Sequence, residues 1–188
     1  MELLITGLIL WSGLHFIPCV GISFRKRLVT KLGGGTYAII FALLVVSSIV
    51  IMVFGWRSIE PVYLYFLPVW SRQVTILLVL LTFILFSAAR AKTNIKRFIR
   101  HPQLTGLVVW GAGHLLSNGD SRSLVLFGSL SVWAIVEMIL INKREGKWIR
   151  PEQATLKSEV SMVAKGLVMF AVFMFAHPFL TGISIITR

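Results

Sequence analysis

The sequence predicts an all-α integral membrane protein, a bundle of about six transmembrane helices in a single domain over residues 1–188. Composition, apolar tracts and the charge of the connectors support this prediction. Of the 188 residues, 56% are hydrophobic and 14% charged, whereas an ordinary globular domain is about 25% charged. A chain this apolar has little surface that faces water. Its net charge of +12 therefore indicates basic connectors that touch the lipid bilayer, and no nucleic-acid partner is expected.

The predicted spans are six apolar tracts, at residues 3–24, 36–54, 74–89, 104–117, 123–141 and 161–186. The tracts do not alternate between polar and apolar residues, so helices are expected to cross the membrane. A straight helix needs about 20 residues to do so. The fourth tract is short unless RHPQ at 100–103 forms its first turn. The first tract lacks a basic start and a cleavage site, which predicts a retained span and not a signal peptide.

The connectors alternate in charge, as six spans require. Residues 25–35, 90–103 and 143–159 carry four, five and five basic residues, whereas 55–73 and 118–122 carry two and one. Basic connectors face the cytoplasm. The pattern therefore predicts that both termini lie on the opposite, periplasmic side.

Two histidines are predicted to lie near the middle of the membrane. His15 precedes the cytoplasmic end of the first span by about ten residues, and His114 follows the start of the fourth span by about ten, so each is roughly 15 Å deep. Two imidazoles at one depth on antiparallel helices are able to bind one metal ion. A buried histidine that serves only as a polar contact between helices is the simpler interpretation.

The sequences around these histidines are alike, WSGLH at 11–15 and WGAGH at 110–114. The spacing stacks Trp11 on His15 and Trp110 on His114, each pair on one helical face. The small residues between them permit either close helix packing or the approach of a flat cofactor. We therefore expect these two tryptophans to contribute to the cofactor site.

The paired histidines favour haem over zinc. Two imidazoles fill both axial positions of a haem iron, whereas a structural zinc site needs about four protein ligands. The chain has no C-x-x-C-H motif, so the haem would be the non-covalent b type. Arg100 is a candidate for a haem propionate, and His101–Pro102 is a candidate helix start. Weaker candidates, with roles that the sequence leaves open, are Cys19, Glu137, Lys165 and His177.

The chain resembles the NnrU family of membrane proteins. GLHFIP at 13–18, RHPQLTGLVVWGAGHLLSNGD at 100–120 and SLVLFGSLSVWAIVEM at 123–138 are the segments that carry the resemblance. It implies a bacterial inner-membrane protein linked to denitrification and nitric oxide metabolism. The family is also similar to plant 15-cis-zeta-carotene isomerase, a membrane enzyme with haem b. By that similarity His15 and His114 match its haem-binding histidines, and His101 matches another histidine of the shared motif.

Two alternatives remain open, and whether the chain is an enzyme is uncertain. RHPQLTG resembles a stretch that binds S-adenosylmethionine in isoprenylcysteine and phospholipid methyltransferases. Those enzymes follow it with a carboxylate-rich segment containing tyrosine, and NKREGKWIRPEQATLKSE at 142–159 has no tyrosine. The other alternative is a non-catalytic membrane assembly factor whose histidines only pack helices. The substrate, any electron donor and the oligomeric state are not predicted.

Overall fold

The computed structural model describes residues 1–183 and has two compact units, one of residues Met1–Glu60 and one that begins at Pro61. Each unit is described by itself. The described residues are predominantly helical, and their β-type pairing is an isolated bridge between Tyr63 and Asp120. The predicted all-helical class is confirmed.

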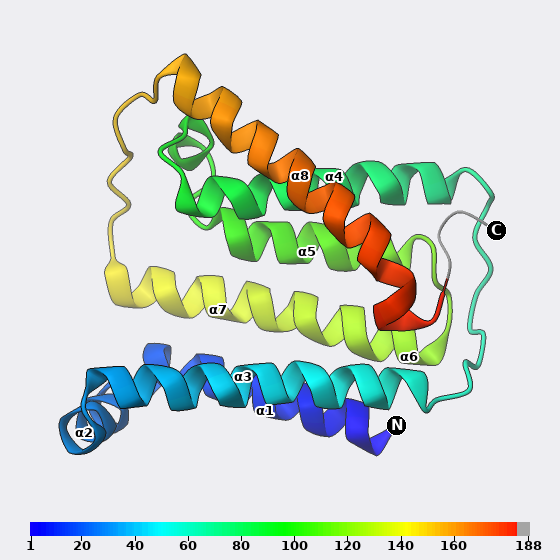
Figure 1. The fold of residues 1–188 in the computed structure, drawn as a ribbon, viewed down its shortest axis with the longest axis horizontal. Coiled ribbons are helices and arrows are strands. Elements are labelled where there is room, and N and C mark those ends of the chain that lie inside the picture. The colour runs from blue at the N-terminus through cyan, green and yellow to red at the C-terminus, as the bar shows by residue number, and fades with distance from the viewer. Residues whose placement is uncertain (184–188) are drawn as a thin grey trace. The chain divides into compact units, whose positions relative to one another are not determined.

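The first unit contains helices α1 (Glu2–Val20), α2 (Ile22–Leu32) and α3 (Gly34–Arg57), with α1 packed along α3 (Figure 1). Helix α1 ends two residues after Pro18, so the first span is shorter than the predicted tract. Part of the basic connector forms helix α2, which the apolar pattern did not predict. Gly33 follows α2 with φ +81°, a conformation that glycine adopts easily and that lets the chain turn into α3.

Two glycines bring the backbones of α1 and α3 into direct contact. A Cβ atom on Gly55 would lie 2.5 Å from the backbone nitrogen of Leu4 and 2.8 Å from its Cα. A Cβ atom on Gly7 would lie 2.9 Å from the carbonyl oxygen of Ser48. Small residues allow this close packing between apolar helices. The contact is between backbones, so rotation of a side chain does not relieve a clash.

Gly55→Ala is expected to destabilise the first unit by about 3 kcal/mol, because the new methyl group forces α1 away from α3. The gain in helix propensity, about 1 kcal/mol, does not offset this loss. The free energy of unfolding in detergent measures the effect.

Gly35→Ala is the matched control, since among the described residues no atom lies within 4 Å of the position its Cβ would take. An equal loss of stability in the two variants would contradict the packing of α1 on α3.

The second unit is built on helices α4 (Ser71–Arg90), α5 (Pro102–Leu115), α7 (Ser129–Glu145) and α8 (Leu156–Thr181). Within it, α5 lies between α4 and α7, and α8 packs across α4 (Figure 1). Shorter elements are the 3-10 helix η1 (Asn94–Arg97), the single turn α6 (Ser121–Ser123) and the π-helical turn η2 (Leu124–Gly128), which continues into α7.

Helix α8 is held against α4 by a close backbone contact and by aromatic packing. A Cβ atom on Gly166 would lie 3.0 Å from the Cα of Ile84. The hydroxyl of Ser87 donates to the carbonyl oxygen of Met162 at 2.7 Å. Phe83 packs on Phe173 with ring centroids 5.0 Å apart. The position of α8 on α4 is therefore fixed along several turns.

At one end of the second unit, its two basic connectors are joined to each other. The hydroxyl of Thr93 donates to Glu159 Oε2 at 2.8 Å, the hydroxyl of Ser158 donates to the carbonyl of Lys92 at 2.6 Å, and the amide of Ala154 donates to Asn94 Oδ1 at 3.1 Å. Connectors that alternate along antiparallel helices lie at the same end, so this contact is as the charge pattern predicts.

The two poorly basic connectors meet at the other end. The backbone amide of Leu64 donates to the carbonyl of Gly119 at 2.7 Å, and that of Ser121 donates to Val62 at 2.9 Å. The phenol of Tyr65 donates to the carbonyl of Leu115 at 2.9 Å. Asp120 caps α6 by accepting from the amide of Ser123 at 3.0 Å. The turn between α5 and α6 therefore also anchors the preceding connector.

Tyr65→Phe is expected to cost about 1 kcal/mol of stability near neutral pH, because it removes one donor to the end of α5. Partial burial and the negative charge of Asp120 raise the pKa of Tyr65 above 10.0. Its neutral form is therefore favoured in the folded protein, and its contribution to stability is present below about pH 10 and falls as the pH rises above this value. Unfolding free energies at a series of pH values test this.

The Tyr65→Phe variant is also the control for that measurement. The stability difference between the two proteins should shrink above pH 10. A difference that stays constant across this range would contradict the contact with Leu115.

Within residues 1–183, five helices are long and apolar enough to cross a membrane: α1, α3, α4, the continuous segment Ser121–Glu145, and α8. The chain is thus a multi-pass α-helical membrane protein. Helix α5 begins with Pro102 at its first turn, as predicted, but has only 14 residues. At 1.5 Å per residue it is about 21 Å long, shorter than the hydrocarbon layer.

Candidate functional site

His114 lies in an aromatic cluster in the second unit. Its Nδ1 is 2.9 Å from the carbonyl oxygen of Trp110, one turn earlier on α5. The Trp110 ring lies 4.8 Å from the imidazole, and Phe127 stacks on the imidazole at 4.4 Å with an interplanar angle of 25°. Trp110 and Phe127 also touch each other at 4.7 Å. The imidazole is thus held by one hydrogen bond and two aromatic rings.

Phe127 reaches His114 from the π-helical turn η2. A π turn inserts an additional residue into a helix and is frequent at functional sites. The hydroxyl of Ser131 donates to the carbonyl oxygen of Phe127 at 2.7 Å. Sequence reasoning missed Phe127, because a π turn leaves the apolar tract uninterrupted and produces no capping or turn signal.

The glycines around His114 serve close helix packing. A Cβ atom on Gly106 would lie 2.9 Å from the ring of Phe86, and one on Gly113 would lie 3.2 Å from the Cβ of Leu78, both on α4. The hydroxyl of Thr75 donates to the carbonyl of Gly113 at 2.7 Å. At Gly106 and Gly113 the structure therefore shows close helix approach, which is one of the two predicted uses of the small residues.

His15 repeats the local arrangement in the first unit. Its Nδ1 is 2.8 Å from the carbonyl oxygen of Trp11, and the two rings lie 4.2 Å apart. Phe41 of α3 meets the imidazole edge-on at 5.8 Å. Each tryptophan contacts its histidine across one helical turn, as the spacing predicts, but the rings are tilted by 31° at His15 and by 50° at His114. Phe41 was missed, since one phenylalanine in an apolar helix carries no signal.

The backbone contacts decide which ring nitrogen carries the proton in each histidine. A carbonyl oxygen only accepts hydrogen bonds, so Nδ1 must be the donor in both His15 and His114. In the neutral imidazole, Nε2 then keeps its lone pair. Metal-binding histidines are commonly oriented in this way, with the other nitrogen donating to a backbone carbonyl. His15 lies in the first unit and His114 in the second.

Arg100 and His101 connect the start of α5 to the end of α7. Arg100 Nη1 donates to the carbonyl of Gly146 at 2.8 Å, and Nη2 lies 3.3 Å from Glu145 Oε2. His101 Nε2 lies 2.9 Å from Asn142 Oδ1. Gly146 ends α7 with φ +69°, which places its carbonyl at this contact. The structure therefore gives these two residues interhelical partners within the second unit.

Of the remaining candidates, His177 of α8 lies near enough to His114 to interact with it electrostatically. His177 Nδ1 is 3.1 Å from the carbonyl oxygen of Ile183, just after the end of α8. The imidazole of His177 therefore has a hydrogen-bond partner close by in the sequence. Cys19 is buried near the end of α1, and Glu137 is buried in α7. Lys165 is exposed on α8.

The apolar helices and the paired tryptophan–histidine sites define a multi-pass membrane protein with two similar imidazole sites. Its sequence matches the NnrU protein family over residues 3–185, and the chain belongs to this family. No curated protein matches the chain, and no solved structure does.

Proposed function

We propose that this NnrU-family protein binds one haem b, whose iron would be held by His15 and His114. The observation that carries the proposal is the local structure that the two histidines share. Each donates Nδ1–H to the carbonyl of a tryptophan four residues earlier and contacts the ring of that tryptophan. Each therefore presents an Nε2 lone pair on an oriented ring, which is the form that coordinates iron.

The proposal includes a topology of about six spans in the bacterial inner membrane, with α5 as the short span. The basic connectors would face the cytoplasm and both termini the periplasm. The joined basic connectors of the second unit support this arrangement. It puts His15 and His114 at the same depth, roughly 15 Å from the cytoplasmic side.

For the biological role we propose a link to denitrification and nitric oxide metabolism, which rests on the family resemblance. Haem-dependent isomerisation, as in the plant carotene isomerase, is the second role that a haem at this depth would serve. The fold alone does not select a substrate. The haem itself is therefore the first thing to test.

The experiment is to purify the protein from a haem-replete host and record its absorbance spectrum. The expected result is a Soret band and a pyridine haemochrome of the b type, at about one haem per chain. A cooperative thermal unfolding transition shows that the purified protein is folded. Folded protein without a Soret band would overturn the proposal.

The methyltransferase alternative depends on the stretch RHPQLTG, in which Arg100 and His101 instead hold the end of α7. These contacts favour a structural role for the stretch. Calorimetry with S-adenosylmethionine is therefore expected to show no binding in the micromolar range. Binding in that range would favour the methyltransferase alternative.

A further inference from the structure

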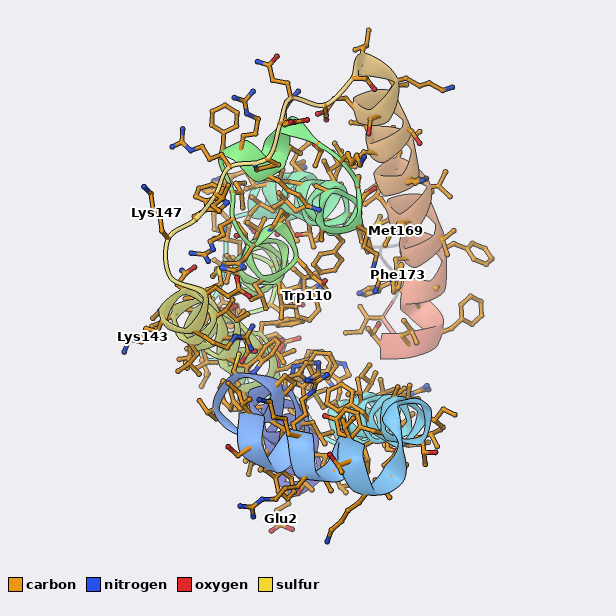
Figure 2. All side chains as sticks on the ribbon, turned by 90° about the vertical axis from the view of Figure 1, so that its left-hand side faces the viewer. Glu2, Trp110, Lys143, Lys147, Met169 and Phe173 are labelled. Atoms are coloured by element: carbon orange, nitrogen blue, oxygen red, sulfur yellow. The ribbon has the colours of Figure 1, made fainter. Side chains whose placement is uncertain are left out.

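A pocket of about 480 Å³ lies in the second unit between α4, α5 and α8. Its polar side is formed by Arg90 of α4, Gln103 of α5 and Lys165 of α8, and its apolar side by Phe86 and Met169. Figure 2 shows Met169 on the side of α8 that faces the rest of the second unit. The pocket is thus amphipathic, with two cationic groups beside an aromatic ring and a thioether.

The two cationic groups have no counter-charge within the protein as described. Among residues 1–183, no carboxylate lies within ion-pair distance of Arg90 or Lys165. Two like charges that converge on one pocket repel each other, and an anion between them removes that repulsion. The guanidinium group, the ammonium group and the Gln103 amide are all hydrogen-bond donors that suit phosphate oxygens.

The pocket lies at the level where α4 ends. Arg90 is the last residue of α4, and Gln103 is the second residue of α5. Lys165 lies nine residues beyond Leu156, about 14 Å along α8, so the first turns of α8 extend past the end of α4. At this end the two basic connectors are joined. In a membrane, the end of such a basic-side helix is at the depth of the lipid headgroups.

We propose that this pocket binds the phosphate headgroup of an anionic phospholipid. Arg90 and Lys165 pair with the phosphate, Gln103 donates a further hydrogen bond, and the start of an acyl chain lies against Phe86 and Met169. Basic pockets between transmembrane helices on the cytoplasmic side are suited to such headgroups. The apolar wall distinguishes a lipid from a free phosphate, which gains nothing from these side chains.

The test uses the full chain, delipidated in a neutral detergent, with binding measured by native mass spectrometry. The probes are phosphatidylglycerol, phosphatidylcholine and inorganic phosphate. Arg90→Gln combined with Lys165→Gln removes both cationic groups of the pocket. Lys147→Gln combined with Arg150→Gln is the matched control, because it removes the same charge from an exposed connector outside the pocket.

Wild-type protein and the control variant should retain phosphatidylglycerol in preference to phosphatidylcholine. The pocket variant should bind phosphatidylglycerol about 25-fold more weakly, at roughly fivefold per basic side chain. Equal weakening in both double variants, or equal retention of the two lipids, would overturn the proposal. Inorganic phosphate that binds as tightly as phosphatidylglycerol would also overturn it, by assigning the pocket to a soluble anion. Thermal unfolding of each variant shows that the protein compared is folded.

Discussion

Replacing His114 with alanine is expected to abolish the low-spin haem spectrum of the purified protein, because alanine offers no donor to the iron. His15→Ala is expected to have the same effect. Removing a residue that only hydrogen-bonds to a metal ligand lowers metal affinity 10- to 100-fold. Removing the ligand itself should therefore lower the haem content by at least about tenfold. Absorbance and pyridine haemochrome assays measure this directly.

His177→Ala is the matched control, since His177 is the other histidine near His114 but pairs with the carbonyl of Ile183. It should keep the Soret band. His114→Met separates ligation from packing, because a thioether also coordinates haem iron. This variant should retain haem with an altered spectrum. A normal spectrum in His114→Ala, or an unaltered one in His114→Met, would contradict binding of the haem iron by His114.

Gly111→Ala and Gly13→Ala are expected to have opposite effects on stability, although both glycines lie between a tryptophan and its histidine. A Cβ atom on Gly111 would clash with the hydroxyl of Ser131 and lie 2.9 Å from the carbonyl oxygen of Phe127. The Ser131 hydroxyl is held by its hydrogen bond to that carbonyl. Overpacking of this kind costs about 2 kcal/mol.

At Gly13, no atom of the described residues lies within 4 Å of the Cβ position, so alanine should be neutral or stabilise α1 by up to about 1 kcal/mol. Unfolding of each variant in detergent gives the two free energies. Equal effects in the two variants would mean that α5 does not pack on η2 and α7 as described.

The apolar tracts predicted most of the helices, because the membrane imposes one requirement on every span and the composition shows it plainly. Pro102 marked the start of α5, and the four-residue spacing placed each tryptophan on its histidine. These features depend on residues close in sequence. The approximate position of a helix and the face it presents depend on residues that are neighbours in the sequence, so a single sequence is enough to predict them.

The missed features depend on residues far apart in the sequence. Phe127 stacks on His114 only because a π turn shifts the register of the helix that carries it. The sequence made Arg100 a candidate for a haem propionate, whereas in the structure its guanidinium group contacts Gly146 and Glu145. Helix α2 was interpreted as a connector because its basic residues masked its helical periodicity. Sequence spacing does not contain such tertiary contacts.

The length of α5 has a consequence for how the protein is made. A 14-residue helix is too short for the bilayer to retain by hydrophobicity alone. Its supports are the threonine hydroxyls of α4, which pair with the carbonyls of Gly106 and Gly113, and the η2–α7 segment, which is synthesised later. The site around His114 should therefore mature only after α7 has left the ribosome, and chains truncated before Ser129 should be recognised and degraded as orphan membrane segments.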